Sequence, residues 1–337
     1  MTEQENVVRG QPTESRPTGL LGTRRTVPGT DLEVARLCLG GNVFGFTCDE
    51  SEAFAVLDAY WEAGGNMIDT ADSYCSFLGT DGGESETIIG RWMADRRNRD
   101  DLVIATKVGQ APGRTDLRRT TIRRALAGSL RRLGVEQIDL YFAHQDHGDP
   151  LDEMVAAFDE LMREGSVRYV AASNFAADRL EESLDLAAVG GRAGFVAVQP
   201  EYHLMNRAGF ESDLAGLCDR RRLGVFPYWA LACGYLTGKY RLHGPAVASP
   251  RHAHVEPFVT EQGERILDLL DMIGTRHQVG IAAIALAWLS ARPGVIAPIA
   301  SARSPEQLGQ LLTFTGVELS PAELRAIDDL APVGSPV

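Results

Sequence analysis

The segments LVIATK (102–107), LRRTTIRRALAGSLRRLG (117–134) and IDLYFAH (138–144) decide the fold class of this chain. The first and third are short and almost wholly apolar, which is typical of parallel strands that are buried on both faces. The middle segment places apolar residues on one stripe with arginines opposite, and it stops at Gly134, as an amphipathic helix does. The pattern predicts a strand–helix–strand unit of a parallel sheet.

The same alternation extends in both directions along the chain. Further apolar runs occur at 35–40, 66–69, 167–173, 195–200, 225–230 and 295–300. Further helical patterns occur at 51–64, 151–165, 177–189, 210–222, 260–276, 281–291, 304–314 and 320–330. Eight strands in sequence with helices between them predict an α/β fold, a (β/α)8 TIM barrel. An N-terminal β-hairpin at 23–34, with Pro28–Gly29 at its turn, and extra C-terminal helices complete the prediction.

A doubly wound open sheet is the alternative α/β architecture. That fold usually carries a G-x-G-x-x-G turn after its first strand. The segment LGGNVFG (39–45) is not such a turn, and the motif occurs nowhere else in the chain. We therefore favour the barrel.

Length and composition bound the domain organisation and the compartment. The 337 residues have 44% apolar content, and we expect one barrel domain over 20–337 after a polar, disordered tail over 1–19. The tail has no basic start followed by an apolar stretch, and no apolar run reaches the roughly 20 residues that span a bilayer. The five cysteines are scattered without a C-x-x-C pair, which favours a reducing, cytoplasmic setting. The net charge of −13 argues against a nucleic-acid partner, and nothing indicates a membrane partner.

Polar residues stand at the carboxyl ends of the predicted strands, where barrel enzymes place their active sites. These residues are Asp69, Lys107, His144, Ser173, Asn174, Gln199, Tyr228, Ser301 and Arg303, with Tyr74 in the loop five residues after Asp69. Each has an ordinary structural explanation by itself, such as a cap, a lysine reaching solvent or a core histidine. Together they predict one site at a single rim.

The residue types at this rim indicate acid–base chemistry. An ammonium group beside a phenol favours the phenolate, so Lys107 is expected to lower the pKa of Tyr74 and let it exchange a proton with an alkoxide. Asp69 would keep the buried Lys107 charged. A neutral imidazole at His144 could orient a substrate carbonyl. No metal is required.

At these residues the chain resembles the aldo-keto reductases. The matching segments are NMIDTADSY (66–74), VIATKVG (103–109), IDLYFAH (138–144), SNF (173–175), VQPEYHLMNR (198–207), LTGKY (236–240) and SARSPEQL (301–308). The segments LACG (231–234) and GKY (238–240) also resemble the β subunits of voltage-gated potassium channels, which share the fold.

The resemblance implies an NADPH-dependent oxidoreductase that reduces an aldehyde or ketone, with Tyr74 as the acid and Asp69, Lys107 and His144 as its partners. Ser173, Asn174 and Gln199 would hold the nicotinamide carboxamide, and Tyr228 would stack on its ring. A loop covering the pyrophosphate would comprise Leu231, Cys233, Gly234, Leu236, Gly238 and Lys239. Ser301 and Arg303 would meet the 2′-phosphate, and Gln307 would approach the adenine ribose. Relatives often carry Glu and Asn where this chain has Gln310 and Leu311, which removes an expected adenine partner.

The substrate pocket is the least determined part of the prediction. Its candidate residues are Phe44, Phe46, Phe77, His147, Tyr202 and Trp229. Sugar carbonyls, small aldehydes and polyketide-like ketones all stay open, as does the oligomeric state. The segment 231–259 shows no clear secondary structure, and long loops of this kind are often functional.

Two other functions compete with the reductase. A barrel metallohydrolase would often carry H-x-H on its first strand, but the only H-x-H, at His252 and His254, lies in the 231–259 segment. A regulatory subunit would bind NADPH with slow turnover or none. The four predicted catalytic residues are all present, which favours the enzyme.

Overall fold

The computed structural model describes residues 19–245, 247–331 and 333. Apart from Gly19, the tail expected at 1–19 lies outside these residues. Eight parallel strands form one sheet in the order β10-β3-β4-β5-β6-β7-β8-β9. They are β3 (Cys38–Gly40), β4 (Met67–Asp69), β5 (Val103–Val108), β6 (Ile138–Ala143), β7 (Val167–Ser173), β8 (Ala197–Gln199), β9 (Gly224–Val225) and β10 (Ile299–Ala300).

The sheet closes on itself between its first and last strands. Val225 in β9 donates its backbone N–H to Gly294 O at 3.0 Å and accepts from Ile296 N at 2.9 Å. Val225 and Val295 form a parallel bridge just before β10. The predicted (β/α)8 barrel is confirmed.

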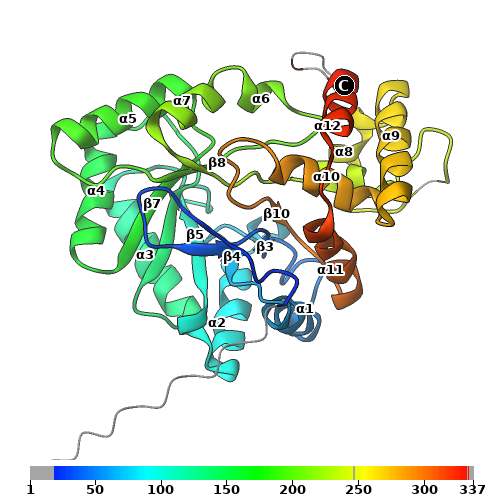
Figure 1. Cartoon of the computed structure of the whole chain (residues 1–337). Coiled ribbons are helices and arrows are strands. Elements are labelled where there is room, and N and C mark those ends of the chain that lie inside the picture. The colour runs from blue at the N-terminus through cyan, green and yellow to red at the C-terminus, as the bar shows by residue number, and fades with distance from the viewer. Residues whose placement is uncertain (1–18, 246, 332, 334–337) are drawn as a thin grey trace, which may run out of the picture.

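The helices lie around the outside of this barrel (Figure 1). They are α1 (Glu50–Glu62), α2 (Glu84–Arg96), α3 (Arg119–Leu133), α4 (Leu151–Arg163), α5 (Ala177–Val189), α6 (Ala208–Glu211), α7 (Leu214–Arg221), α8 (His252–Val255), α9 (Glu261–His277), α10 (Ile281–Ser290), α11 (Pro305–Leu312) and α12 (Pro321–Leu330). α9 and α12 pack against each other, and α11 packs on α1. No helix within the described residues is long and apolar enough to cross a membrane.

Three helical regions differ from the sequence prediction. α2 was not predicted, because its buried face includes the polar Ser85 and Glu86, and its N-cap, Gly83, supplies no capping side chain. The helix expected at 210–222 is two helices, because Asp213 leaves the helical backbone between α6 and α7. The segment 231–259 contains a six-residue 3-10 turn and the short helix α8, neither of which has an amphipathic period that a sequence pattern could show.

The predicted hairpin closes the amino-terminal end of the barrel. Its strands β1 (Arg24–Thr26) and β2 (Glu33–Ala35) pair antiparallel. The turn between them includes Gly29 at φ 73°, a conformation that glycine adopts without strain. Apolar side chains of the hairpin, such as Leu32 and Val34, join the cluster that fills the barrel interior. The hairpin therefore forms the floor of the barrel core.

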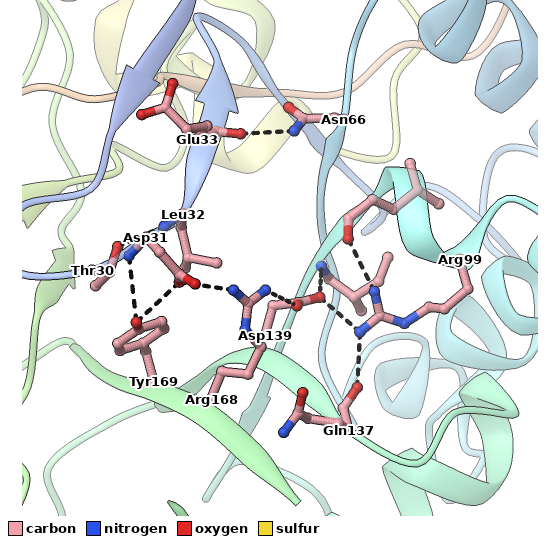
Figure 2. Close-up of polar contacts among 12 residues, drawn as sticks. Thr30, Asp31, Leu32, Glu33, Asn66, Arg99, Gln137, Asp139, Arg168 and Tyr169 are labelled. Atoms are coloured by element: carbon pink, nitrogen blue, oxygen red, sulfur yellow. Dashed lines mark hydrogen bonds and ion pairs between the residues drawn. The ribbon is translucent and has the colours of Figure 1, made fainter. Parts of the chain in front are cut away.

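A polar network ties this hairpin to β6 and β7 (Figure 2). Asp31 accepts hydrogen bonds from Tyr169 Oη at 3.0 Å and from Arg168 Nη2 at 2.8 Å. Arg168 also donates to Asp139 Oδ1 at 2.7 Å, and Arg99 donates to Asp139 Oδ2 at 2.7 Å. Asp139 is thus a buried carboxylate held between two guanidinium groups, as burial of a charge requires. This network holds the hairpin end of the barrel together, so the opposite, carboxyl-terminal rim is the one available for catalysis.

Residues of each strand alternate between two apolar layers. On β6, Leu140 and Phe142 belong to the cluster inside the barrel, whereas Tyr141 and Ala143 belong to the cluster between the sheet and the helices. This alternation follows from the two-residue repeat of a strand. All five cysteines are buried as free thiols, and no disulfide joins them.

Candidate active site

Four predicted catalytic residues meet at the carboxyl-terminal rim. Asp69 is the last residue of β4, Lys107 is near the end of β5, and His144 follows β6 directly. Lys107 Nζ lies 2.7 Å from Asp69 Oδ2 and 2.9 Å from Tyr74 Oη. The rings of Tyr74 and His144 lie edge to face at 6.3 Å. Parallel strands thus bring together side chains that are far apart in sequence.

Lys107 is fully buried, yet each of its ammonium hydrogens has an acceptor. Besides Asp69 and Tyr74, it donates to Thr70 O at 2.8 Å. Burial lowers the pKa of Lys107, and the adjacent Asp69 carboxylate opposes that shift. The complete set of acceptors stabilises the charged form, because burying an unpaired ammonium would be costly.

The direction of the Tyr74 pKa differs from the sequence expectation. Burial raises the pKa of Tyr74 well above its ordinary value, and the Asp69 carboxylate raises it further, both by its charge and by accepting the phenol proton at 3.1 Å. The neighbouring Lys107 does not reverse these two effects. Tyr74 is therefore held as a neutral phenol, which keeps a proton available for donation.

His144 is held in its neutral form. Burial lowers the pKa of His144 well below its ordinary value, and the Lys107 charge lowers it further. Its Nδ1 is buried without a hydrogen-bond partner among the described residues. The imidazole therefore has donor and acceptor capacity that the protein itself does not use.

The rim opens into a cavity of about 1190 Å³. The predicted site residues that line it are Asp69, Tyr74, His144, Ser173, Asn174, Gln199, Tyr228, Trp229, Leu231, Cys233, Gly234, Lys239, Ser301, Arg303 and Gln307. Gln310 and Leu311 also line it. The buried Lys107 stands behind Tyr74 and Asp69. Most of the predicted residues therefore share one concave space, as ligand sites commonly do.

Amide and hydroxyl groups form one wall of the cavity beside Asp69. Gln199 Nε2 donates to Asp69 Oδ1 at 2.8 Å, which leaves Gln199 Oε1 without a partner in the described part of the chain. Ser173 Oγ donates to Gln199 O at 2.8 Å. Tyr228 Oη donates to Asn174 Oδ1 at 2.9 Å, and Asn174 Nδ2 donates to His144 O at 2.9 Å. These bonds fix the Tyr228 ring and leave Gln199 Oε1 as an unused acceptor.

The far part of the cavity carries positive charge. The lining includes Lys239, Arg251 and Arg303, and no hydrogen bond or ion pair of the Arg303 guanidinium occurs among the described residues. Ser301 Oγ donates to Asn42 Oδ1 at 2.8 Å, and Arg251 Nη2 approaches the same oxygen at 3.4 Å. In a chain of net charge −13, such a local cluster favours an anionic ligand.

Several predicted residues lie elsewhere. Leu236 is fully buried, and neither Leu236 nor Gly238 lines the cavity. Phe44 is completely buried and belongs to the large core cluster. Phe77 is 64% exposed and meets the Phe46 ring edge-on at 4.8 Å.

Two further substrate candidates have structural contacts of their own. His147 Nε2 lies 2.6 Å from Gly109 O, and the residue does not line the cavity. Tyr202 is buried, and its hydroxyl donates to Glu211 Oε1 at 2.7 Å. Trp229 alone of the substrate candidates lines the cavity, with its ring 5.3 Å from that of His254.

Sequence reasoning missed the contribution of Arg251 and of the α9–α10 junction. Arg251 comes from the 231–259 segment, whose irregular pattern gives no register from which to place a side chain. Gly274, Thr275 and residues 278–283 line the cavity where α9 ends and α10 begins. A helix amino terminus such as that of α10 attracts anions. The glycine at 280, directly before an apolar helical run, was the available signal.

The histidines of the predicted metal alternative do not form a metal site. His252 and His254 lie on α8, and His254 contacts Trp229 through its ring. No cluster of three His, Cys, Asp or Glu side chains with suitable placement occurs in the described ranges.

Comparison with known proteins identifies the family. The model of the aldo/keto reductase family matches residues 36–332. The chain is 34% identical over 313 residues to the uncharacterized oxidoreductase YrpG of Bacillus subtilis, covering 90% of this chain and 94% of YrpG. It is 30% identical over 350 residues to norsolorinic acid reductase stcV of Emericella nidulans, covering 97% and 86% of the two chains.

A third relative is a probable voltage-gated potassium channel subunit beta of Oryza sativa, 32% identical over 290 residues, with 82% of this chain and 86% of that protein covered. The resemblance that the sequence motifs indicated is confirmed: the chain belongs to the aldo/keto reductase family and is an oxidoreductase.

Proposed function

We propose that this protein is an NADPH-dependent reductase that converts an aldehyde or ketone to an alcohol reversibly, with Tyr74 as the general acid. The observation that carries the proposal is the contact of Lys107 Nζ with Tyr74 Oη at 2.9 Å and with Asp69 Oδ2 at 2.7 Å, at a cavity that Tyr74 and Asp69 line. A phenol that lies beside a buried ammonium can deliver a proton and then be stabilised as the phenolate.

Tyr74 has a defined route for its proton. Its hydroxyl donates to Asp69 Oδ2 at 3.1 Å and accepts from Lys107 at 2.9 Å. Rotation of the O–H bond toward the cavity would direct the proton to a substrate oxygen while Lys107 continues to donate. The ammonium then stabilises the negative charge that develops on the phenol oxygen. Because Lys107 is wholly shielded from water, this stabilisation is stronger than it would be in solvent.

His144 would orient the substrate. Its neutral imidazole lies beside Tyr74, and its Nδ1 has no hydrogen-bond partner in the part of the chain that the structure describes. One ring nitrogen can donate to the carbonyl oxygen that Tyr74 protonates. Two donors converging on one oxygen would fix the carbonyl in a reactive position.

The cavity has a donor set that fits a nicotinamide dinucleotide. Bound NADPH would supply the hydride for the carbonyl carbon. Gln199 Oε1 is available to accept from a carboxamide N–H, and the Tyr228 ring is held in place by Asn174. At the cationic end, Lys239 and Arg251 would bind the pyrophosphate.

Arg303 would select NADPH over NADH. Its guanidinium is exposed on the cavity, and Ser304 caps the helix α11 that follows, by accepting from Gln307 N. An arginine fork binds a phosphate through paired charge-assisted hydrogen bonds. Gln307 Oε1 accepts from Arg303 N at 3.0 Å, so Gln307 supports the Arg303 backbone and would approach the adenine ribose of bound NADPH.

The test is consumption of NADPH and of NADH by the purified protein with a panel of aldehydes, ketones and sugar carbonyls. We expect turnover with at least one carbonyl and a preference for NADPH. The potassium-channel relative favours a second function, an NADPH-binding regulatory subunit. Tight NADPH binding without turnover of any carbonyl in the panel would favour that second function and contradict the first.

A further inference from the structure

A second cavity lies on the outer surface of the barrel, away from the catalytic rim. Its volume is about 350 Å³, and it shares no lining residue with the large cavity. The lining consists of Arg114, Arg124, Ala125, Gly128, Arg131 and Arg132. Four of these six residues are arginines, and the other two are small, so guanidinium groups form most of its polar surface.

The spacing on α3 produces this arrangement. Arg124, Gly128 and Arg131 stand at positions i, i+4 and i+7, which lie on one face of a helix. Gly128 between the two arginines leaves the floor of the cavity open. A side chain at Gly128 would approach Arg132 Nη1 to 3.0 Å, so the glycine also makes room for Arg132 to fold against the helix.

The four arginines differ in how they are neutralised. Arg132 Nη2 lies 2.6 Å from the buried Glu86 Oε2. Arg114 Nε lies 3.7 Å from Asp72 Oδ2, and this buried nitrogen makes no hydrogen bond with any described residue. Arg124 and Arg131 are exposed, and neither is within ion-pair distance of a carboxylate in the described part of the chain.

The charge balance therefore defines the ligand. Four guanidinium groups face only two carboxyl groups of the described residues, those of Glu86 and Asp72, so the cavity keeps at least two positive charges. Arginine forks bind phosphate oxygens in pairs. A cavity of about 350 Å³ admits a small molecule but not a folded partner.

We propose that this cavity is a binding site for a small phosphate anion, such as inorganic phosphate, pyrophosphate or the phosphate group of a metabolite. Arg124 and Arg131 supply the uncompensated charge, and Arg114, whose nearest contact with Asp72 is 3.7 Å long, adds a third guanidinium group. The proposal does not rest on the proposed reductase reaction, since none of these lining residues borders the large cavity.

The same arginines argue against self-association through this face. A two-fold interface would place identical patches opposite each other. Arg124 and Arg131 of two copies would then repel, because α3 carries no acidic residue to pair with them. The net charge of −13 also disfavours a nucleic acid as the occupant.

Two of the lining arginines also contact segments that lead to the catalytic rim. Asp72, the partner of Arg114, lies two residues before Tyr74 in the same loop. Glu86, the partner of Arg132, accepts a hydrogen bond from Thr106, the residue before Lys107. These contacts place the cavity next to the segments that carry Tyr74 and Lys107.

The experiment is titration calorimetry of the full-length protein with sodium pyrophosphate at fixed ionic strength. We compare the natural protein with R124Q/R131Q and with the control R222Q/R325Q, which removes two exposed arginines from other parts of the surface. The exposed, unpaired positions of Arg124 and Arg131 predict normal folding, which urea unfolding checks. Pyrophosphate that binds at the cationic end of the large cavity gives the same signal in all three proteins.

We expect R124Q/R131Q to lose one binding event, or to weaken it at least about tenfold, while the control keeps it. Equal binding by all three proteins would overturn the proposal, since Arg124 and Arg131 would then contribute nothing to it. Equal weakening in both variants would overturn it too, since the effect would then be one of general charge. Citrate serves as a carboxylate probe at matched ionic strength. Citrate binding as tight as pyrophosphate binding, with the same dependence on Arg124 and Arg131, would overturn the assignment to phosphate.

Discussion

Replacing Lys107 with methionine tests, through the stability of the protein, whether Lys107 and Asp69 form a buried ion pair. The ammonium is wholly inaccessible to solvent and donates to Asp69 Oδ2, Thr70 O and Tyr74 Oη. Methionine retains an unbranched stem of similar length but has no charge. Asp69, which is 1% exposed, would keep Gln199 and Tyr74 as donors but would lose its only cationic partner among the described residues.

The expected magnitude follows from that uncompensated carboxylate. Removing one partner of a buried ion pair costs about 3–5 kcal/mol of stability, because the other charge stays buried. Adding Asp69→Asn to Lys107→Met removes the stranded charge. The double variant should therefore be more stable than the sum of the two single changes predicts, by at least about 2 kcal/mol.

The assay is urea unfolding of the natural protein, of the two single variants and of the double variant, followed by circular dichroism at one pH. A coupling energy of the expected sign shows that the two residues form a buried pair. Additivity to within about 0.5 kcal/mol would refute the reasoning, because it would mean that the two groups act independently.

Arg303→Ala should weaken NADPH binding by about ten- to a hundredfold, because a charge-assisted hydrogen bond contributes about 1.5–3 kcal/mol, while NADH binding changes little. Fluorescence titration measures both affinities, and equal losses for the two cofactors would show that Arg303 does not recognise the 2′-phosphate. Burial raises the pKa of Asp72 from 3.8 to about 7. Between these two pH values the folded protein retains a proton that the unfolded chain releases, so the free energy of unfolding falls as the pH rises. Relative to Asp72→Asn, the natural protein should lose up to about 3 kcal/mol of unfolding free energy from about pH 5 to pH 7, at about 1.4 kcal/mol per unit, and parallel pH profiles would contradict this. Asp139→Ala should destabilise the protein by about 3 kcal/mol in urea unfolding, because Arg99 and Arg168 lose a shared acceptor that is 2% exposed; a change below about 0.5 kcal/mol would show that the network is not structural.

The strand ends explain why so much of the site could be predicted. Short apolar runs ended at Asp69, Lys107 and Gln199, and the barrel topology requires such ends to meet at one rim. The structure brings these three side chains into direct contact. The residue types and the order of the runs therefore predicted that these three side chains converge, but they did not predict the hydrogen bonds between them.

The local sequence pattern could not predict features that depend on the three-dimensional surroundings of a residue. Glu86 and Ser85 interrupt the apolar face of α2, and their role becomes visible only with Thr106 and Thr70 as partners. Arg251 enters the cavity from a segment without a period. The pKa of Tyr74 was expected to fall because Lys107 was weighed alone, whereas burial and Asp69 dominate once the packing is known.

The substitution Tyr74→Phe tests the central claim most directly. Phenylalanine keeps the ring that lies over Lys107, whose Nζ is 4.7 Å from the ring centroid, and removes only the hydroxyl. We predict that kcat for carbonyl reduction falls by at least about a hundredfold while NADPH binding is unchanged, because only the proton donor is lost. A Tyr74→Phe enzyme with undiminished kcat would contradict the account, since some other group would then have to supply the proton.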